Sequence, residues 1–212
     1  MPRRPIGVEG QQDASPMTLL NLDGYTDLPA GKIAAVVTYL EMKERPAAPP
    51  AEPLPLRPVP APDLAWYRSL YARIGLDWLW TSRLLMTDAE VAAVLHHPAN
   101  ALFVAEEAAD AIGIVELDRR NPEDVEISFF GLVPGATGQG LGPRMMAAAL
   151  GQAWQPETRR VWLHTCTLDH PGAVSFYRRC GFTPYKRAIE VMDDPRLTGA
   201  IPREAAPRVP LI

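Results

Sequence analysis

A glycine-rich run, Val133 to Gly142, stands between two segments of contrasting pattern. The residues Val125–Val133 are typical of a strand, and a helix is expected from Gly142 to about Trp154. Glycines let a backbone turn tightly and bring bare N–H groups close to an anion, and the dipole of the following helix adds partial positive charge. This chemistry suits a ligand that carries phosphate, and a pyrophosphate is the natural candidate.

The residues around these glycines exclude two familiar phosphate-binding loops. No Gly-Lys-Ser/Thr ends the run, as a P-loop requires. A dinucleotide fingerprint requires an acidic ribose-binding residue about twenty positions beyond the strand, but that region reads Arg159, Arg160, Val161. A glycine-rich turn without any ligand is the alternative interpretation.

A second block, Ala173 to Phe182, reads Ala-Val-Ser-Phe-Tyr-Arg-Arg-Cys-Gly-Phe. Together with Val133, Pro134 and the run Thr137 to Gly142, it resembles the GNAT superfamily of N-acetyltransferases. The coenzyme A motif of that superfamily is Arg or Gln, two residues, Gly, one residue, and Gly or Ala. Thr137 occupies the place of the Arg or Gln, so the loop lacks the long side chain that usually reaches over it. The resemblance covers roughly residues 56–192 and is best defined over 125–182.

The resemblance implies acetyl-coenzyme A as the cofactor. It places the thioester carbonyl against backbone N–H groups near the end of the Val125–Val133 strand, where strands of this superfamily splay. Leu132 and Val133 are therefore the candidates for the polarising amide. His170 and Asp169 stand where many relatives have an Asn that contacts the pantetheine arm. The residues expected to contact the cofactor are Leu132, Val133, Thr137, Gly138, Gln139, Gly140, Leu141, Gly142, His170 and Tyr177.

Two residues are the catalytic candidates. Tyr177 matches the tyrosine that commonly acts as general acid toward the coenzyme A sulfur; the alternative is a buried aromatic residue on an amphipathic helix. Glu126 is the candidate base, because a carboxylate on one face of a central strand is otherwise costly to bury. The alternative for Glu126 is a structural ion pair with Arg119 or Arg120. His164 on a neighbouring strand could serve as the base instead.

An aromatic segment before these motifs resembles the part of the fold that walls the acceptor site. Trp78 and Trp80, just beyond a glycine, are the substrate-binding candidates, whereas the helical period places Tyr67 and Tyr71 in the core. Nothing in the sequence identifies the amine, which could be a small metabolite, an antibiotic, a peptide terminus or a protein lysine.

The order of elements predicts an α/β fold: a GNAT-like mixed, mostly antiparallel central sheet with helices on both faces and an N-terminal β extension. Helices are expected at Asp63–Gly75 and just after Thr87, and a hairpin turns at Ala108–Asp110. The predicted organisation is a flexible tail (1–16), a strand pair (17–45), a proline-rich linker or edge strand (46–62), the acyltransferase domain (56–195) and a C-terminal tail (196–212). The two strands of the pair are expected at Met17–Leu22 and Lys32–Met42.

The composition narrows the class of protein. A net charge of -4 and a pI near 5.6 argue against nucleic-acid or anionic-membrane binding. Two cysteines without metal-site spacing, and no signal peptide or spanning segment, favour a cytoplasmic protein with no metal. The main hypothesis is an N-acetyltransferase for a primary amine, with a homodimer possible. The alternatives are a non-catalytic acyl-coenzyme A-binding module and an α/β interaction protein.

Overall fold

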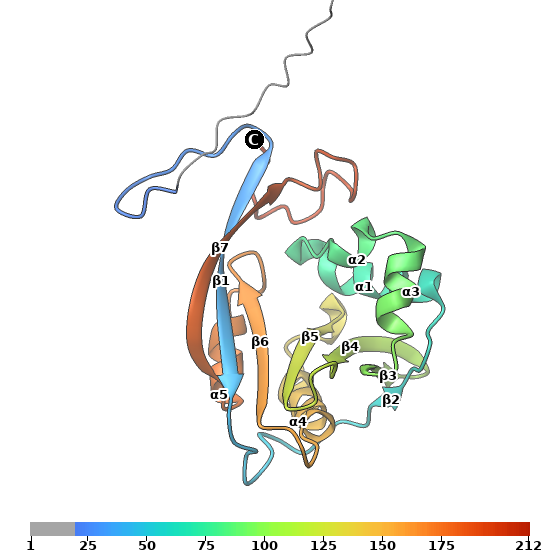
Figure 1. The fold of residues 1–212 in the computed structure, drawn as a ribbon. Helices are drawn as coiled ribbons and strands as arrows, with labels where there is room; N and C mark the ends of the chain where they lie inside the picture. The colour runs from blue at the N-terminus through green and yellow to red at the C-terminus, as the bar shows by residue number, and fades with distance from the viewer. Residues whose placement is uncertain (1–19) are drawn as a thin grey trace, which may run out of the picture.

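The computed structural model describes residues 20–212, which contain one mixed sheet with helices on both faces (Figure 1). The helices are α1 (Leu64–Gly75), α2 (Ser82–Leu85), α3 (Asp88–Leu95), α4 (Leu141–Ala153) and α5 (Ala173–Arg179), with short 3-10 turns at Leu76–Trp78 and Pro134–Ala136. The strands are β1 (Lys32–Met42), β2 (Arg57–Pro58), β3 (Asn100–Glu107), β4 (Asp110–Asp118), β5 (Asp124–Leu132), β6 (Arg160–Cys166) and β7 (Thr183–Asp193). Within the described residues the sheet has seven strands in the order β2-β3-β4-β5-β6-β1-β7.

Two hydrophobic clusters lie on opposite faces of the sheet, because successive strand residues point to alternate sides. On β3, Phe103 and Ala105 belong to the cluster beneath α4 and α5, whereas Leu102 and Val104 belong to the cluster beneath α1 and α3. Tyr67 and Tyr71 of α1 are completely buried in the second cluster, which confirms their predicted core position.

Local signals in the sequence correctly located α1 and α3. The Asp63 side chain accepts a hydrogen bond from the backbone N–H of Trp66 and caps α1. Thr87 and Glu90 form the predicted capping box at the start of α3. These caps fix the residues at which α1 and α3 begin.

The two halves of the sheet separate between β5 and β6. This pair is parallel and joined only from Asp124–Arg160 to Glu126–Trp162, whereas β4 pairs with β5 up to Leu132. Beyond Glu126 the two strands no longer pair, and Figure 1 shows β5 and β6 diverging. The backbone groups of β5 that face β6 are therefore free of sheet hydrogen bonds over the second half of the strand.

Of the strand pair predicted in residues 17–45, the second strand is confirmed as β1, Lys32–Met42, whereas the described part of the first is not a strand. Residues 17–19 lie outside the described residues, and residues 20–31 contain no strand. Strand β1 lies instead inside the sheet, antiparallel to both β6 and β7. Residues 32–42 are therefore part of the central sheet and not an extension of it.

The C-terminal residues are not a free tail. Ile201, Ala205 and Ala206 are buried against Ile33 and Ala35 of β1. The proline-rich segment contains β2, a two-residue strand at the opposite edge of the sheet. No helix within residues 20–212 is long and apolar enough to cross a membrane.

Candidate active site

A cavity of about 1140 Å³ opens where β5 and β6 separate. Its lining includes residues of the glycine loop, the second half of β5, the end of β6 and the start of α5. Six of the residues singled out from the sequence for catalysis or substrate binding line it together: Glu126, Leu132, His164, Tyr177, Trp78 and Trp80. The fold thus brings segments far apart in the sequence to one hollow.

The glycine loop exposes its backbone as the sequence predicted. Gly138 and Gly140 have φ angles of +78° and +74°, a left-handed conformation that glycine adopts without strain, and open space surrounds their α-carbons. Across Gly138–Gly142, no described residue accepts a hydrogen bond from a backbone N–H group. The side chains of Thr137 and Gln139 fold back onto the carbonyls of Pro134 and Gly135. The loop therefore presents uncovered N–H groups at the start of α4, as an anion site requires.

The free amides of β5 differ from those proposed from the sequence. The N–H of Val133 donates to the carbonyl of Ile112 at 2.9 Å, so Val133 is wrong as a polarising amide. Antiparallel pairing alternates, so the N–H groups of Leu132 and Phe130 point away from β4, toward the gap beside β6. Leu132 thus keeps its predicted geometry. Phe130 was not predicted, and it lies two residues nearer to Glu126.

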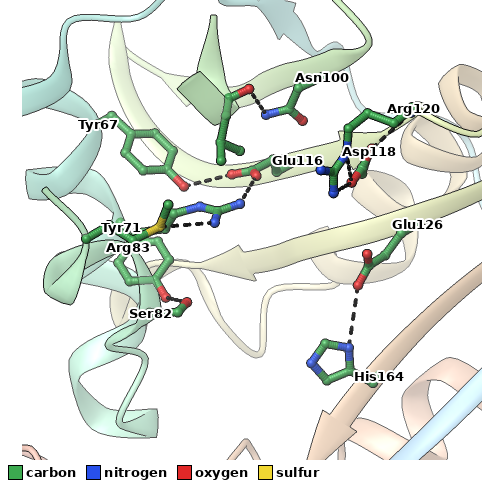
Figure 2. Close-up of polar contacts among 12 residues, drawn as sticks. Tyr67, Tyr71, Ser82, Arg83, Asn100, Glu116, Asp118, Arg120, Glu126 and His164 are labelled. Carbon is green, nitrogen blue, oxygen red and sulfur yellow. Dashed lines mark hydrogen bonds and ion pairs between the residues drawn. The ribbon is translucent and has the colours of Figure 1, made fainter. Parts of the chain in front are cut away.

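Glu126 faces the cavity and pairs with His164. The carboxylate Oε1 lies 3.6 Å from Nδ1 of His164, whose side chain is 46% exposed (Figure 2). The interaction with Glu126 raises the pKa of His164, and burial opposes this less strongly. The alternative ion pairs of Glu126 are not formed, because Arg120 binds Asp118 and Arg119 donates to the carbonyl of Gln152. The two candidate bases therefore form one unit.

Tyr177 lies both in the core and in the cavity wall. It packs against Phe130, Phe176 and Phe182 and is 9% exposed. Burial raises the pKa of its phenol well above the ordinary value near 10, with a smaller contribution from Asp169. The side chain is thus a protonated phenol at neutral pH, able to donate toward the cavity.

The predicted residues around His170 have protein partners of their own. Nδ1 of His170 accepts a hydrogen bond from the N–H of Gly172, and its ring lies 5.4 Å from that of Trp78. Trp80 donates from Nε1 to Asp169 at 2.9 Å, and the second Asp169 oxygen accepts from the hydroxyl of Thr165. Trp78, Trp80 and His170 nevertheless border the cavity.

A buried carboxylate on β4 was missed by the sequence analysis. Glu116 is 1% exposed and accepts hydrogen bonds from the Tyr67 hydroxyl, at 2.7 Å, and from Arg83 (Figure 2). Burial acts against the charge of Arg83, but Glu116 outweighs it and raises the pKa of Arg83. The signal was a single glutamate within the apolar run of residues 111–118, the same kind of signal that identified Glu126.

Solved structures share this fold at low sequence identity. A GNAT-family protein from Novosphingobium aromaticivorans superposes with a TM-score of 0.54 at 13% identity, over 78% of this chain and 68% of its own. An acetyltransferase from Thermus thermophilus gives 0.51 at 20% identity, over 66% of this chain and 96% of its own. A GCN5-related N-acetyltransferase from Sphaerobacter thermophilus superposes with a TM-score of 0.52 at 15% identity, over 76% of this chain and 52% of its own. The likeness defines a GNAT-type fold.

The family follows from the sequence. A family model described as the acetyltransferase (GNAT) family matches residues 65–182, more than half of the chain. The chain therefore belongs to the acetyltransferase (GNAT) family, as its motifs indicated. No curated protein matches it in sequence.

Proposed function

We propose that this protein transfers an acetyl group from acetyl-coenzyme A to a primary amine by direct attack. Membership of the GNAT family supports acyl transfer as the class of reaction. The observation that carries the proposal is that the glycine loop, the free face of β5, the Glu126–His164 pair and Tyr177 all border the same cavity.

The residues of the glycine loop fit a coenzyme A pyrophosphate. Uncovered N–H groups over Gly138–Gly142 and open space beside Gly138 and Gly140 give an anion both donors and room. Acetyl-coenzyme A, when bound, supplies the acetyl thioester on which the amine acts. His170 and Gly142 border the same hollow and are assigned to the cofactor side.

The chain's own groups meet the three requirements of amine acylation. The outward N–H groups of Phe130 and Leu132 would polarise the carbonyl, as donors placed where negative charge develops. The Glu126–His164 pair would accept the proton of the amine, directly or through a water. Tyr177 would hold a proton at its phenol oxygen for the leaving sulfur, since its raised pKa keeps the phenol protonated.

Replacement of Tyr177 by Phe tests the reaction, because it removes one hydroxyl and keeps the ring that packs in the core. General acid catalysis by a positioned side chain typically contributes about 10²–10⁴-fold, so we expect kcat to fall by about a hundredfold. Binding of coenzyme A, measured by titration calorimetry, is expected to be unchanged. Phe182→Leu, a change in the same aromatic cluster, is the control for a packing effect and should keep most of kcat.

A non-catalytic acyl-coenzyme A-binding module is the second candidate. Its support is the loop itself, because Thr137 replaces a long side chain and its hydroxyl bonds to Pro134 at 2.7 Å instead of reaching outward. This candidate predicts coenzyme A binding without release of free thiol from acetyl-coenzyme A in the presence of any amine. Measurable turnover by the parent protein that is lost in Tyr177→Phe would exclude it.

A further inference from the structure

The cavity extends past Glu126 along a row of polar side chains. Asn100 of β3 lies directly opposite Asp118 of β4, and Asp118 lies directly opposite Glu126 of β5. Opposed residues on neighbouring strands point to the same face with their Cβ atoms about 5 Å apart. All three side chains line the cavity, and Figure 2 shows them on adjacent strands. The row thus leads away from the Glu126–His164 pair toward a second polar position.

One oxygen in this row lacks a donor. The Nδ2 group of Asn100 donates to the carbonyl of Val94 at 3.1 Å, which fixes the orientation of the amide. Its Oδ1 atom is buried and has no hydrogen-bond partner within the described part of the chain. Buried acceptors in native proteins are normally satisfied, so an unpaired one on a cavity wall indicates a donor supplied by a ligand or by water.

Asp118 supplies a carboxylate beside this oxygen. Burial opposes ionisation, but hydrogen bonds from Arg120 outweigh it and lower the pKa of Asp118, so the group is an anion at neutral pH. The Arg120 side chain that binds it, with Nε to Oδ2 at 2.8 Å, is 70% exposed, whereas Asp118 is 19% exposed. Arg120 also borders the cavity and donates to both carboxylate oxygens of Asp118, so a cation in the cavity competes with Arg120 for these oxygens.

The charge of the whole lining favours a cation as well. Among the described residues, five carboxylates and three arginines border the cavity. Two of these arginines are already bound: Arg83 to Glu116, and Arg120 to Asp118. Oδ1 of Asn100 and the carboxylate oxygens of Asp118 are all potential hydrogen-bond acceptors, and an ammonium group carries three donors, so one such group can donate to both residues.

We propose that the acetyl acceptor is an alkyl diamine. Its reacting nitrogen is placed at the Glu126–His164 pair, and its second nitrogen, as an ammonium, is held by Asp118 and Oδ1 of Asn100. The inference rests on the proposed function, because it names the substrate class of the same site. An extended chain of three carbons spans roughly 5 Å between its end nitrogens, which is close to the spacing of neighbouring strands.

The test compares diamines with monoamines of equal length. Unbranched diamines of three to five carbons and the matching n-alkylamines are supplied with saturating acetyl-coenzyme A, and kcat/KM is measured from the release of free thiol. Charge-assisted hydrogen bonds are strong, so we expect the diamine to be preferred by about tenfold or more at the best chain length.

Asp118→Asn keeps the shape of the side chain and removes its charge, so it should abolish most of this preference. Asp110→Asn is the matched control, because Asp110 lies on the same strand and binds Arg73, but it does not line the cavity. It should keep the full preference. Arg120→Gln, at an exposed position, removes the competing cation and should raise kcat/KM for diamines alone. The thermal unfolding midpoints of all three variants check that they fold.

The possible results distinguish a failure of the diamine assignment from a failure of the proposed acetyl transfer. Equal use of diamines and monoamines, or a preference that survives Asp118→Asn, overturns the diamine assignment. The absence of turnover for the whole amine series, in a protein that acetyl-coenzyme A stabilises, also overturns it. If acetyl-coenzyme A neither stabilises the protein nor is consumed, the proposed function fails, and the assignment of its acceptor fails with it.

Discussion

At the scale of single residues, the contact between Glu126 and His164 joins two candidate bases that the sequence left as alternatives. Their side chains come from different strands, β5 and β6, and face each other at 3.6 Å. A carboxylate beside an imidazole favours the charged imidazolium, so the proton affinity of His164 reports on the pair.

His164 should titrate above its ordinary pKa of about 6.5. In Glu126→Gln the carboxylate charge is gone, so the midpoint should move down toward the ordinary value. The folded protein holds this proton more tightly than the unfolded chain, so protonation stabilises the fold below pH ~6.5, and this stabilisation is lost as pH rises through the folded pKa. NMR titration of the histidine ring protons measures both midpoints. Equal midpoints in the two proteins would contradict the pairing.

Some residues of the candidate site could be predicted from the sequence, and others could not. Glu126 could be predicted because a carboxylate in a central strand is conspicuous, and Glu116 carried the same signal. The free N–H of Phe130 could not be predicted, because it depends on which residues of β5 pair with β4, and a shift by one residue would exchange Phe130 for Gly131. The partners of Trp80 and His170 likewise depend on the folded positions of Asp169 and Gly172.

At the scale of elements, the glycine loop was the most predictable feature, because its conformation is set by the residues within it. Gly138 and Gly140 both adopt positive φ angles that other residues reach only with strain. The separation of β5 from β6 could not be derived in the same way, because it depends on long-range contacts. The two strands pair at only three positions, and the sequence does not show where this pairing stops. The sequence analysis took that separation from the family resemblance.

Gly140→Val should lower the free energy of unfolding by about 1–2 kcal/mol, because a left-handed conformation strains any residue with a Cβ atom. It should also reduce the stabilisation by acetyl-coenzyme A, since the N–H groups of the loop would shift. Gly135→Ala is the matched control: Gly135 lies in the same loop without a positive φ, and no atom lies within 4 Å of an added Cβ atom. Chemical denaturation of both variants measures the difference. Equal stabilities of the two variants would refute the strained conformation.

At the scale of the whole molecule, the C-terminal segment packs against β1, the first strand of the described chain. Strand β1 pairs with β6 and β7, and residues 201–206 pack over Ile33 and Ala35. The sequence correctly marked Lys32–Met42 as a strand, but the position of a strand within a sheet depends on partners more than a hundred residues away. The composition of residues 196–212, with three prolines and no apolar period, gave no sign that they are packed.

A buried ion pair stabilises the packing of this C-terminal segment. Arg196 and Asp194 are 4% and 2% exposed, and Arg196 also donates to the carbonyl of Val209 at 2.7 Å. Arg196→Met leaves the Asp194 charge without its partner, so we expect the free energy of unfolding to fall by about 3 kcal/mol. Arg203→Met, at an exposed position of the same segment, should change it by less than about 0.5 kcal/mol. Urea denaturation measures the free energy of unfolding of both variants. A similar small decrease in both would show that the ion pair does not stabilise the segment.

The central claim is that the loop from Val133 to Gly142 binds acetyl-coenzyme A, and thermal unfolding with and without this ligand tests it most directly. A ligand that binds only the folded state stabilises it by roughly 2.7 kcal/mol at about 100 times its dissociation constant. We predict a clear rise in the unfolding midpoint of the parent protein, with a smaller rise in Gly140→Val. An unchanged midpoint at millimolar acetyl-coenzyme A would contradict the claim and leave the glycine loop as a turn between β5 and α4.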